Sequence, residues 1–162
     1  MTQVPATLRA EDIGSEILIG RFRAKLRVLP GSDCLWWTGA ISRNAGHGRF
    51  WLGTGRVVVA HRFAFALAEG LDALTGAEVL AHACDNPLCQ RIGAGHVVAS
   101  TRAQNQIDWL ARGAVSAGNY IGPDSSYDRS LVMRNLLLLD PGGAARHLAS
   151  LPHRHGVQLP LW

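Results

Sequence analysis

Two cysteines and a histidine within thirteen residues are the first feature of this sequence with the chemistry of a metal site. Cys84, Cys89 and His96 surround turn-forming residues, so a loop that folds back can bring them together. Zinc prefers four nitrogen and sulfur ligands in a tetrahedron, and Cys34 can supply the fourth. Such a closed site would hold structure and not do chemistry. The alternative is that the thiols are small buried hydrophobic side chains and His96 is a polar strand-edge residue.

A histidine and an asparagine beside this loop have the chemistry of a hydrolytic pair. His82 precedes Cys84 by two residues, and Asn105 lies near the start of the next predicted helix. An imidazole can take a proton from water near neutral pH, and an amide oxygen can hold Mg²⁺ against a phosphate. The alternative is a structural histidine and a helix-capping asparagine. His61, at the start of an apolar helix, is interpreted as a packed or capping residue, and His96 is preferred over His47 and His61 as a zinc ligand.

The elements that must position these residues follow from periodicity and from breaks at glycine and proline. Period-2 and apolar runs predict strands at 34–41, 49–52, 56–60, 78–83 and 97–99. Helical periodicity predicts helices at 10–27, 61–69, 102–112, 131–139 and 144–151, with Gly70 and Gly113 ending two of them. Residues 119–126 are rich in glycine, proline and serine and predict a linker.

Composition limits the class of protein. Hydrophobic residues make up 48% of the 162, which is enough for a real core. The formal net charge is +4, and Lys25 is the only lysine, so the basic residues are almost all arginine. Arginine suits phosphate binding, and the alternative explanation of the excess is codon bias. No stretch is apolar enough to span a membrane and no signal peptide is visible, so we expect a cytoplasmic protein. In that compartment three cysteines favour metal binding over disulfide bonds.

Residues 34–113 resemble the HNH and His-Cys box endonucleases of the His-Me finger group. The resemblance is strongest in His82-Ala83-Cys84-Asp85-Asn86-Pro87-Leu88-Cys89. It extends to Cys34-Leu35-Trp36-Trp37-Thr38-Gly39-Ala40, Gly46-His47-Gly48-Arg49-Phe50, Ala60-His61-Arg62-Phe63-Ala64, Gly95-His96-Val97, Asn105 and Arg112-Gly113. Ala81 stands where many HNH enzymes have an acidic metal ligand, so the sequence is most similar to the His-Cys box version. Arg91-Ile92 replaces the usual Asn-Pro.

The resemblance implies a role for each matching residue. His82 matches the general base, Asn105 the Mg²⁺ ligand, and Cys34 with the loop residues Cys84, Cys89 and His96 the structural Zn²⁺ ligands. Other divalent cations can substitute for Mg²⁺ in such a site. Arg49 and Arg62 lie in matching segments and are the candidate DNA-phosphate contacts, the alternative being surface solvation or packing.

The expected fold class is therefore α+β. It comprises a zinc-pinned ββα-metal finger with an N-terminal helix, a small antiparallel sheet and a helical C-terminal appendage. Residues 1–118 would form the endonuclease domain, and residues 119–162 a linker and an appendage that covers the core or a partner subunit. The expected activity is metal-dependent hydrolysis of double-stranded DNA, and a homodimer is an open alternative. The competing hypotheses are a zinc-stabilised nucleic-acid-binding module without catalysis and a purely structural zinc protein.

Overall fold

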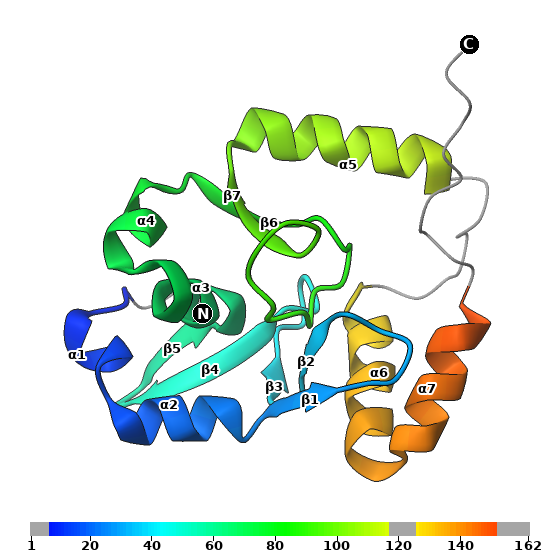
Figure 1. Cartoon of the computed structure of the whole chain (residues 1–162), viewed down its shortest axis with the longest axis horizontal. Helices are drawn as coiled ribbons and strands as arrows, with labels where there is room; N and C mark the ends of the chain where they lie inside the picture. Colours follow the sequence, from blue (N-terminus) through cyan, green and yellow to red (C-terminus); the bar gives the residue numbers. More distant parts are fainter. Residues whose placement is uncertain (1–6, 117–125, 152–162) are drawn as a thin grey trace.

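Small antiparallel sheets and helices alternate along the chain, which gives a mixed α+β fold (Figure 1). The computed structural model describes residues 7–116 and 126–151. The helices are α1 Ala10–Ile13, α2 Glu16–Arg23, α3 Ala60–Glu69, α4 Leu71–Gly76, α5 Arg102–Ser116, α6 Ser126–Leu139 and α7 Pro141–Ser150. The strands are β1 Leu26–Val28, β2 Leu35–Trp37, β3 Ala40–Ile41, β4 Gly48–Gly53, β5 Arg56–Val59, β6 Val79–His82 and β7 Val97–Ser100.

Three separate sheets carry the strands, and all their pairings are antiparallel. β1 pairs with β2, the order β3-β4-β5 forms the second sheet, and β6 pairs with β7. In the last hairpin Val79 is opposite Ser100 and His82 is opposite Val97, so His82 lies at the end where the long loop of residues 83–96 begins. Helix α5 follows this hairpin directly, and the Thr101 hydroxyl caps it by accepting from the Gln104 backbone N–H at 3.0 Å.

Four aromatic rings form the centre of the core. Phe22, Trp37, Phe50 and Phe63 come from α2, β2, β4 and α3, and each is 3% exposed or less. The Phe50 and Phe63 centroids are 4.7 Å apart, and those of Phe22 and Trp37 are 5.1 Å apart. Aromatic rings bury the most apolar area per side chain, so this group fixes α2 and α3 against the β3-β4-β5 sheet.

The predicted helix over 10–27 is wrong as a single element. Gly14 ends α1, and the Ser15 hydroxyl caps α2 by accepting from the Leu18 backbone N–H at 3.3 Å. The last residues of the prediction form β1 instead, because β2 provides an antiparallel partner. Pairing with a distant strand overrides local periodicity here.

The predicted strand over 34–41 is also divided, into β2 and β3. The backbone N–H and hydroxyl of Thr38 both donate to the Lys25 carbonyl, at 2.8 and 2.9 Å, which turns the chain between the two strands. Helix α4 was not predicted from the sequence. Helix α5 continues past the predicted end at Gly113, to Ser116.

The helices α6 and α7 pack on the same core as the rest of the fold. Met133, Leu137 and Ala144 are buried within the main hydrophobic cluster, and the Arg134 guanidinium donates to the Gly39 carbonyl at 2.8 Å. Helix α6 begins at Ser126, five residues before the predicted start, while residues 119–125 of the predicted linker and 152–162 of the tail lie outside the described residues. No helix in the described ranges is long and apolar enough to cross a membrane.

Candidate functional site

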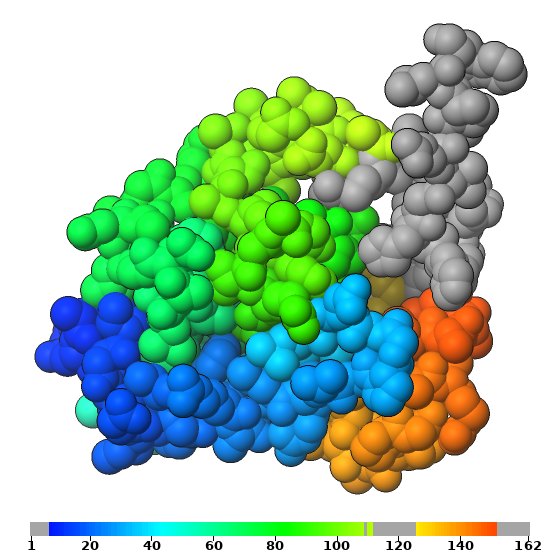
Figure 2. All heavy atoms as spheres, in the orientation of Figure 1, coloured from blue at the N-terminus to red at the C-terminus, as the bar shows by residue number. Residues whose placement is uncertain are grey.

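The four predicted zinc ligands come together from two distant parts of the chain. Backbone bridges hold residues 35–36 against residues 89–90: Trp36 pairs with Cys89, and the Gln90 N–H donates to the Leu35 carbonyl at 2.7 Å. In Figure 2 the green loop between β6 and β7 lies beside the blue segment that leads into β2. At the other end of the loop, the Ala83 N–H donates to the His96 carbonyl at 2.7 Å, which brings His96 beside the start of the loop.

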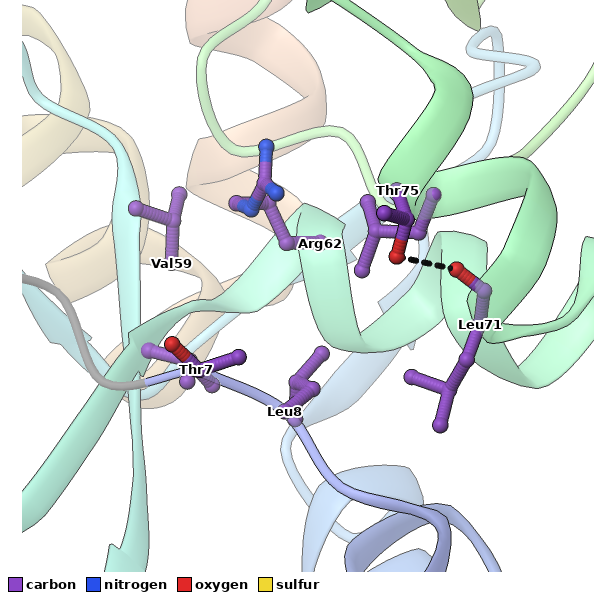
Figure 3. A pocket seen from close by; sticks show the side chains of 8 residues that line it. Thr7, Leu8, Val59, Arg62, Leu71 and Thr75 are labelled. Carbon is purple, nitrogen blue, oxygen red and sulfur yellow. Dashed lines mark hydrogen bonds between the residues drawn. The ribbon is translucent and has the colours of Figure 1, made fainter.

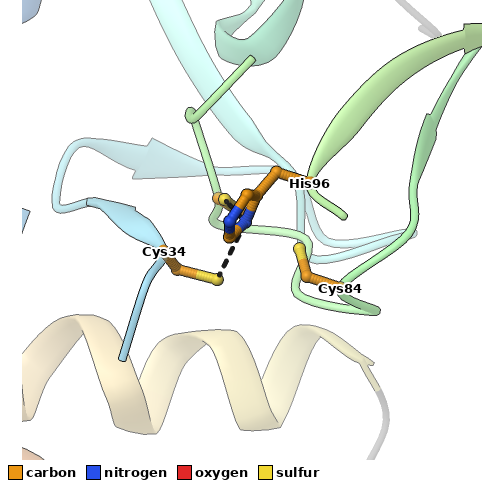
Figure 4. A group of neighbouring side chains, drawn as sticks. Cys34, Cys84 and His96 are labelled. Atoms are coloured by element: carbon orange, nitrogen blue, oxygen red, sulfur yellow. Dashed lines mark hydrogen bonds between the residues drawn. The ribbon is translucent and has the colours of Figure 1, made fainter. Parts of the chain in front are cut away.

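The geometry of this Cys/His cluster fits a tetrahedral zinc ion. One ligand atom from each of Cys34, Cys84, Cys89 and His96 lies within 4.8 Å of the others. The His96 Nδ1 is 3.6 Å from the Cys89 Sγ and 3.9 Å from the Cys34 Sγ, and the Cys34 and Cys84 side chains point toward the His96 ring (Figure 4). Ideal Zn–S and Zn–N bonds in a tetrahedron separate sulfur and nitrogen by about 3.6 Å. The cluster can therefore hold a metal ion such as zinc.

The protonation of the three thiols is coupled. Hydrogen bonds from Cys84 and then Cys89 lower the pKa of the Cys34 thiol to about 2, while the interaction with Cys34 raises the pKa of Cys89 to about 11 and also raises that of Cys84. Like charges in so small a space disfavour one another, so only one thiol ionises readily. A coordinated zinc ion would remove this conflict, because a coordinating thiol is deprotonated by the metal.

A second cluster, made of histidines alone, surrounds the predicted catalytic residue. The His82 Nε2 is 3.1 Å from the His61 Nδ1, and the His82 ring stacks on the His47 ring at a centroid distance of 5.3 Å and an angle of 18°. The His61 ring meets the other two edge-on. Each ring offers a nitrogen within 4.8 Å of the others, so we name His47, His61 and His82 the histidine cluster.

Three different elements carry these rings. His82 ends β6, and His61 is the second residue of α3, where the chain leaves β5. His47 lies in the turn before β4, which closes through the Ser42 N–H donating to the His47 carbonyl at 2.9 Å. The preceding Gly46 has a φ of +70°, and a Cβ there would collide with the Ser126 carbonyl, so glycine is required.

Burial keeps the histidine cluster neutral. Desolvation is the main cause that lowers the pKa of His82 to about 3, with a further effect of His47. Burial also lowers the pKa of His61, which is 7% exposed, and that of His47. The His82 Nδ1 is itself buried and has no hydrogen-bond partner among the described residues. All three rings therefore present neutral imidazoles at pH 7.

The structure does not pair His82 with Asn105 through a hydrogen bond. Asn105 is half-buried on the first turn of α5, its backbone N–H donates to the Thr101 carbonyl at 2.9 Å, and its side chain has no hydrogen bond to another described residue. The start of α5 is held near the start of β6 because the Arg102 N–H donates to Glu78 at 3.2 Å. Within the described part of the chain, the rings that contact His82 are those of His47 and His61.

The two predicted DNA-contacting arginines lie in different surroundings. Arg49 is half-buried on β4, opposite Val59. Arg62 follows His61 on α3 and lines a pocket together with Leu8, Leu71 and Thr75 (Figure 3). Arg62 is half-buried at the edge of this pocket, so neither its role in DNA contact nor the alternative of packing is decided by its position.

A comparison with curated proteins places the chain among relatives. The chain is 31% identical over 106 residues to Protein 7.7 of Escherichia phage T7, a match that covers 65% of this chain and 77% of the phage protein. This chain belongs to the Protein 7.7 family. No protein-family model matches the sequence, and no solved structure matches it. The name of this relative states no activity, so a function has to be argued from the site itself.

The sequence alone did not predict that His47 and His61 of this Protein 7.7 family member belong to a histidine cluster. Both lie in short segments quoted above for the resemblance to HNH and His-Cys box endonucleases, Gly46-His47-Gly48 and Ala60-His61-Arg62. The glycines on each side of His47 were the available signal: Gly46 admits the close approach of α6, and a Cβ on Gly48 would meet the Trp37 ring at 2.6 Å. The contact between the three rings depends on tertiary packing, which no local pattern encodes.

Proposed function

We propose that this protein is a metal-dependent endonuclease that hydrolyses DNA phosphodiester bonds. In this proposal β6, β7 and α5 form the ββα unit of a His-Me finger, and the Cys/His cluster holds a structural Zn²⁺ ion. The observation that supports it is the position of His82, at the end of a hairpin strand and two residues before the first loop cysteine of the cluster. A closed zinc site would lock that strand end and the ring beside it.

His82 would act as the general base. Its pKa of about 3 keeps the ring neutral at pH 7, so it has a lone pair with which to accept a proton from the attacking water. A ring with so low a pKa is a weak base in the free protein. A phosphodiester beside it would raise the pKa, since a nearby negative charge favours the protonated imidazole. His61, 3.1 Å from His82, would orient the ring and thus serve as a positioning residue.

Asn105 would hold Mg²⁺ through its amide oxygen, a hard ligand of the kind this ion prefers. Bound there, Mg²⁺ supplies positive charge that stabilises the scissile phosphate and the leaving 3′ oxygen. Ala81, which precedes His82 in the sequence, offers no carboxylate. Oxygens of the DNA and of water would therefore complete the coordination of Mg²⁺. The proposal requires α5 to bring Asn105 toward His82 when DNA is bound.

Double-stranded DNA is the proposed substrate. The net charge of +4 favours a polyanion, and Arg49 and Arg62 are the proposed phosphate contacts. Arg62 would have to extend its guanidinium from the pocket that its stem lines. A non-catalytic nucleic-acid-binding module is the second candidate, and the observation that favours it is the absence of a hydrogen bond between His82 and Asn105 among the described residues.

Nicking of supercoiled plasmid with and without Mg²⁺ tests the proposal. Because a chelator would also extract zinc from the Cys/His cluster, the metal-free sample omits Mg²⁺ and activity is restored by adding it back. We expect nicked or linear plasmid only with Mg²⁺. A protein with a full equivalent of zinc that shifts DNA in a gel yet never cuts it would support the binding module instead.

A further inference from the structure

We propose that the histidine cluster is a second metal site, which binds Zn²⁺ or a similar first-row transition ion through one nitrogen each of His47, His61 and His82. The site is separate from the Cys/His cluster and shares no ligand with it. It is also separate from the proposed Mg²⁺ site, whose protein ligand is an amide oxygen.

The spacing of the nitrogens fits a single small ion. The His82 Nε2 and His61 Nδ1 are 3.1 Å apart, and all three ligand nitrogens lie within 4.8 Å of one another. Two imidazole nitrogens bound to a tetrahedral zinc ion at ordinary bond lengths are separated by about 3.4 Å. The His61 and His82 nitrogens are thus within a few tenths of an ångström of the coordinating separation, and the His47 nitrogen lies close enough to complete the site by a movement of its ring.

A contact of His47 with the backbone favours one tautomer of its ring. The His47 Nδ1 is 3.4 Å from the Pro87 carbonyl, to which a protonated Nδ1 can donate. This leaves the lone pair on Nε2 for an ion. A backbone carbonyl that holds the other ring nitrogen is the usual support for a histidine metal ligand, because it sets both the tautomer and the ring orientation.

The donor set selects the class of ion. Three imidazoles with no carboxylate in the cluster suit zinc, copper, nickel or cobalt and not the oxygen-seeking Mg²⁺ or Ca²⁺. Three protein ligands leave the fourth tetrahedral position open to water or another small ligand. In this respect the histidine cluster differs from the Cys/His cluster, whose four protein ligands close the coordination shell.

A metal ion bound to the histidine cluster would change the activity of the proposed endonuclease. A neutral imidazole has one lone pair, so a His82 ring that ligates an ion cannot also accept a proton from water. On the proposed function, added Zn²⁺ therefore inhibits cleavage by engaging the general base. This consequence rests on the proposed function, whereas the metal site itself does not.

Metal stoichiometry of the full-length protein tests the site directly. After equilibrium dialysis against Zn²⁺, we expect two equivalents in the wild type and in a His147→Gln control, whose histidine lies on α7 outside the cluster. His47→Gln and His61→Gln should each keep one equivalent. That retained equivalent in the Cys/His cluster shows that the variant is folded, and the half-buried His47 provides a variant even if the buried His61 is needed for folding.

Cobalt identifies the ligands of the second ion. Co²⁺ added to protein that already holds one zinc should give visible ligand-field bands without a thiolate charge-transfer band. A wild type that binds one equivalent, or His47→Gln and His61→Gln variants that still bind two, would overturn the second site. Failure of the proposed function looks different, because the protein would then bind two ions and cut no DNA.

Discussion

Replacing Gly46 with alanine tests how the C-terminal helices hold the histidine cluster. The residue has a φ of +70°, and an alanine Cβ would lie 2.7 Å from the Ser130 hydroxyl as well as against the Ser126 carbonyl. The left-handed backbone costs a non-glycine residue about 1–2 kcal/mol. The overlap with α6 adds about 1–3 kcal/mol. We therefore expect Gly46→Ala to lower the free energy of unfolding by about 2–5 kcal/mol.

A second glycine separates these two costs. Gly55 has a similar φ of +75°, and a Cβ there meets nothing within 4 Å. Gly55→Ala should therefore show only the backbone cost, and Gly46→Ala should be less stable than it by about 1–3 kcal/mol in urea denaturation of the full chain. Equal stabilities would refute the packing of α6 on the turn that carries His47. A lower zinc stoichiometry of folded Gly46→Ala would show that the same packing positions the His47 ring.

Three further predictions concern the zinc site, acid stability and DNA binding. Cys84→Ser, or removal of zinc by a chelator, should unfold the domain, since structural zinc contributes roughly 10–16 kcal/mol in small zinc domains; an unchanged melting temperature with zinc absent would contradict this. The pKa values of His61 and His82 are lowered in the fold, so below the ordinary value of 6.5 the unfolded chain takes up protons first and stability falls as pH decreases toward 3. The slope should approach about 1.4 kcal/mol per pH unit for each histidine, and His61→Gln should flatten it; identical slopes would argue against buried neutral rings. Arg49→Gln should weaken gel-shift binding without Mg²⁺ and reduce the salt slope by about 1, whereas an unchanged slope would remove it from the interface.

The Cys/His cluster could be predicted from the sequence because its chemistry is nearly local. Cys84, Cys89 and His96 lie in one loop whose turns bring its ends together, and only Cys34 had to be added from a distance. The residue types alone restrict the ligand choice, since few other functions need thiols and an imidazole at that spacing. The hairpin of β6 and β7 could be predicted for the same reason, because its two strands flank that loop.

The histidine cluster could not be predicted, because three separate elements meet there. His61 on an apolar helix has the same pattern whether its ring packs in the core or faces two other histidines. The pairing of β1 with β2 explains a similar error: Leu26 continues a helical stripe, and a partner strand decides its conformation. Patterns within one element predict that element, whereas contacts between elements depend on packing that the sequence does not display.

Plasmid cleavage by His82→Ala compared with wild type is the most direct test of the proposed nuclease. General-base catalysis contributes about 10²–10⁴-fold, so we predict a loss of at least ~10²-fold in the Mg²⁺-dependent nicking rate. DNA binding in a gel shift and the zinc equivalent of the Cys/His cluster should remain, and His147→Ala should cut at the wild-type rate. A folded His82→Ala protein that nicks plasmid as fast as wild type would contradict the role of His82 as the base.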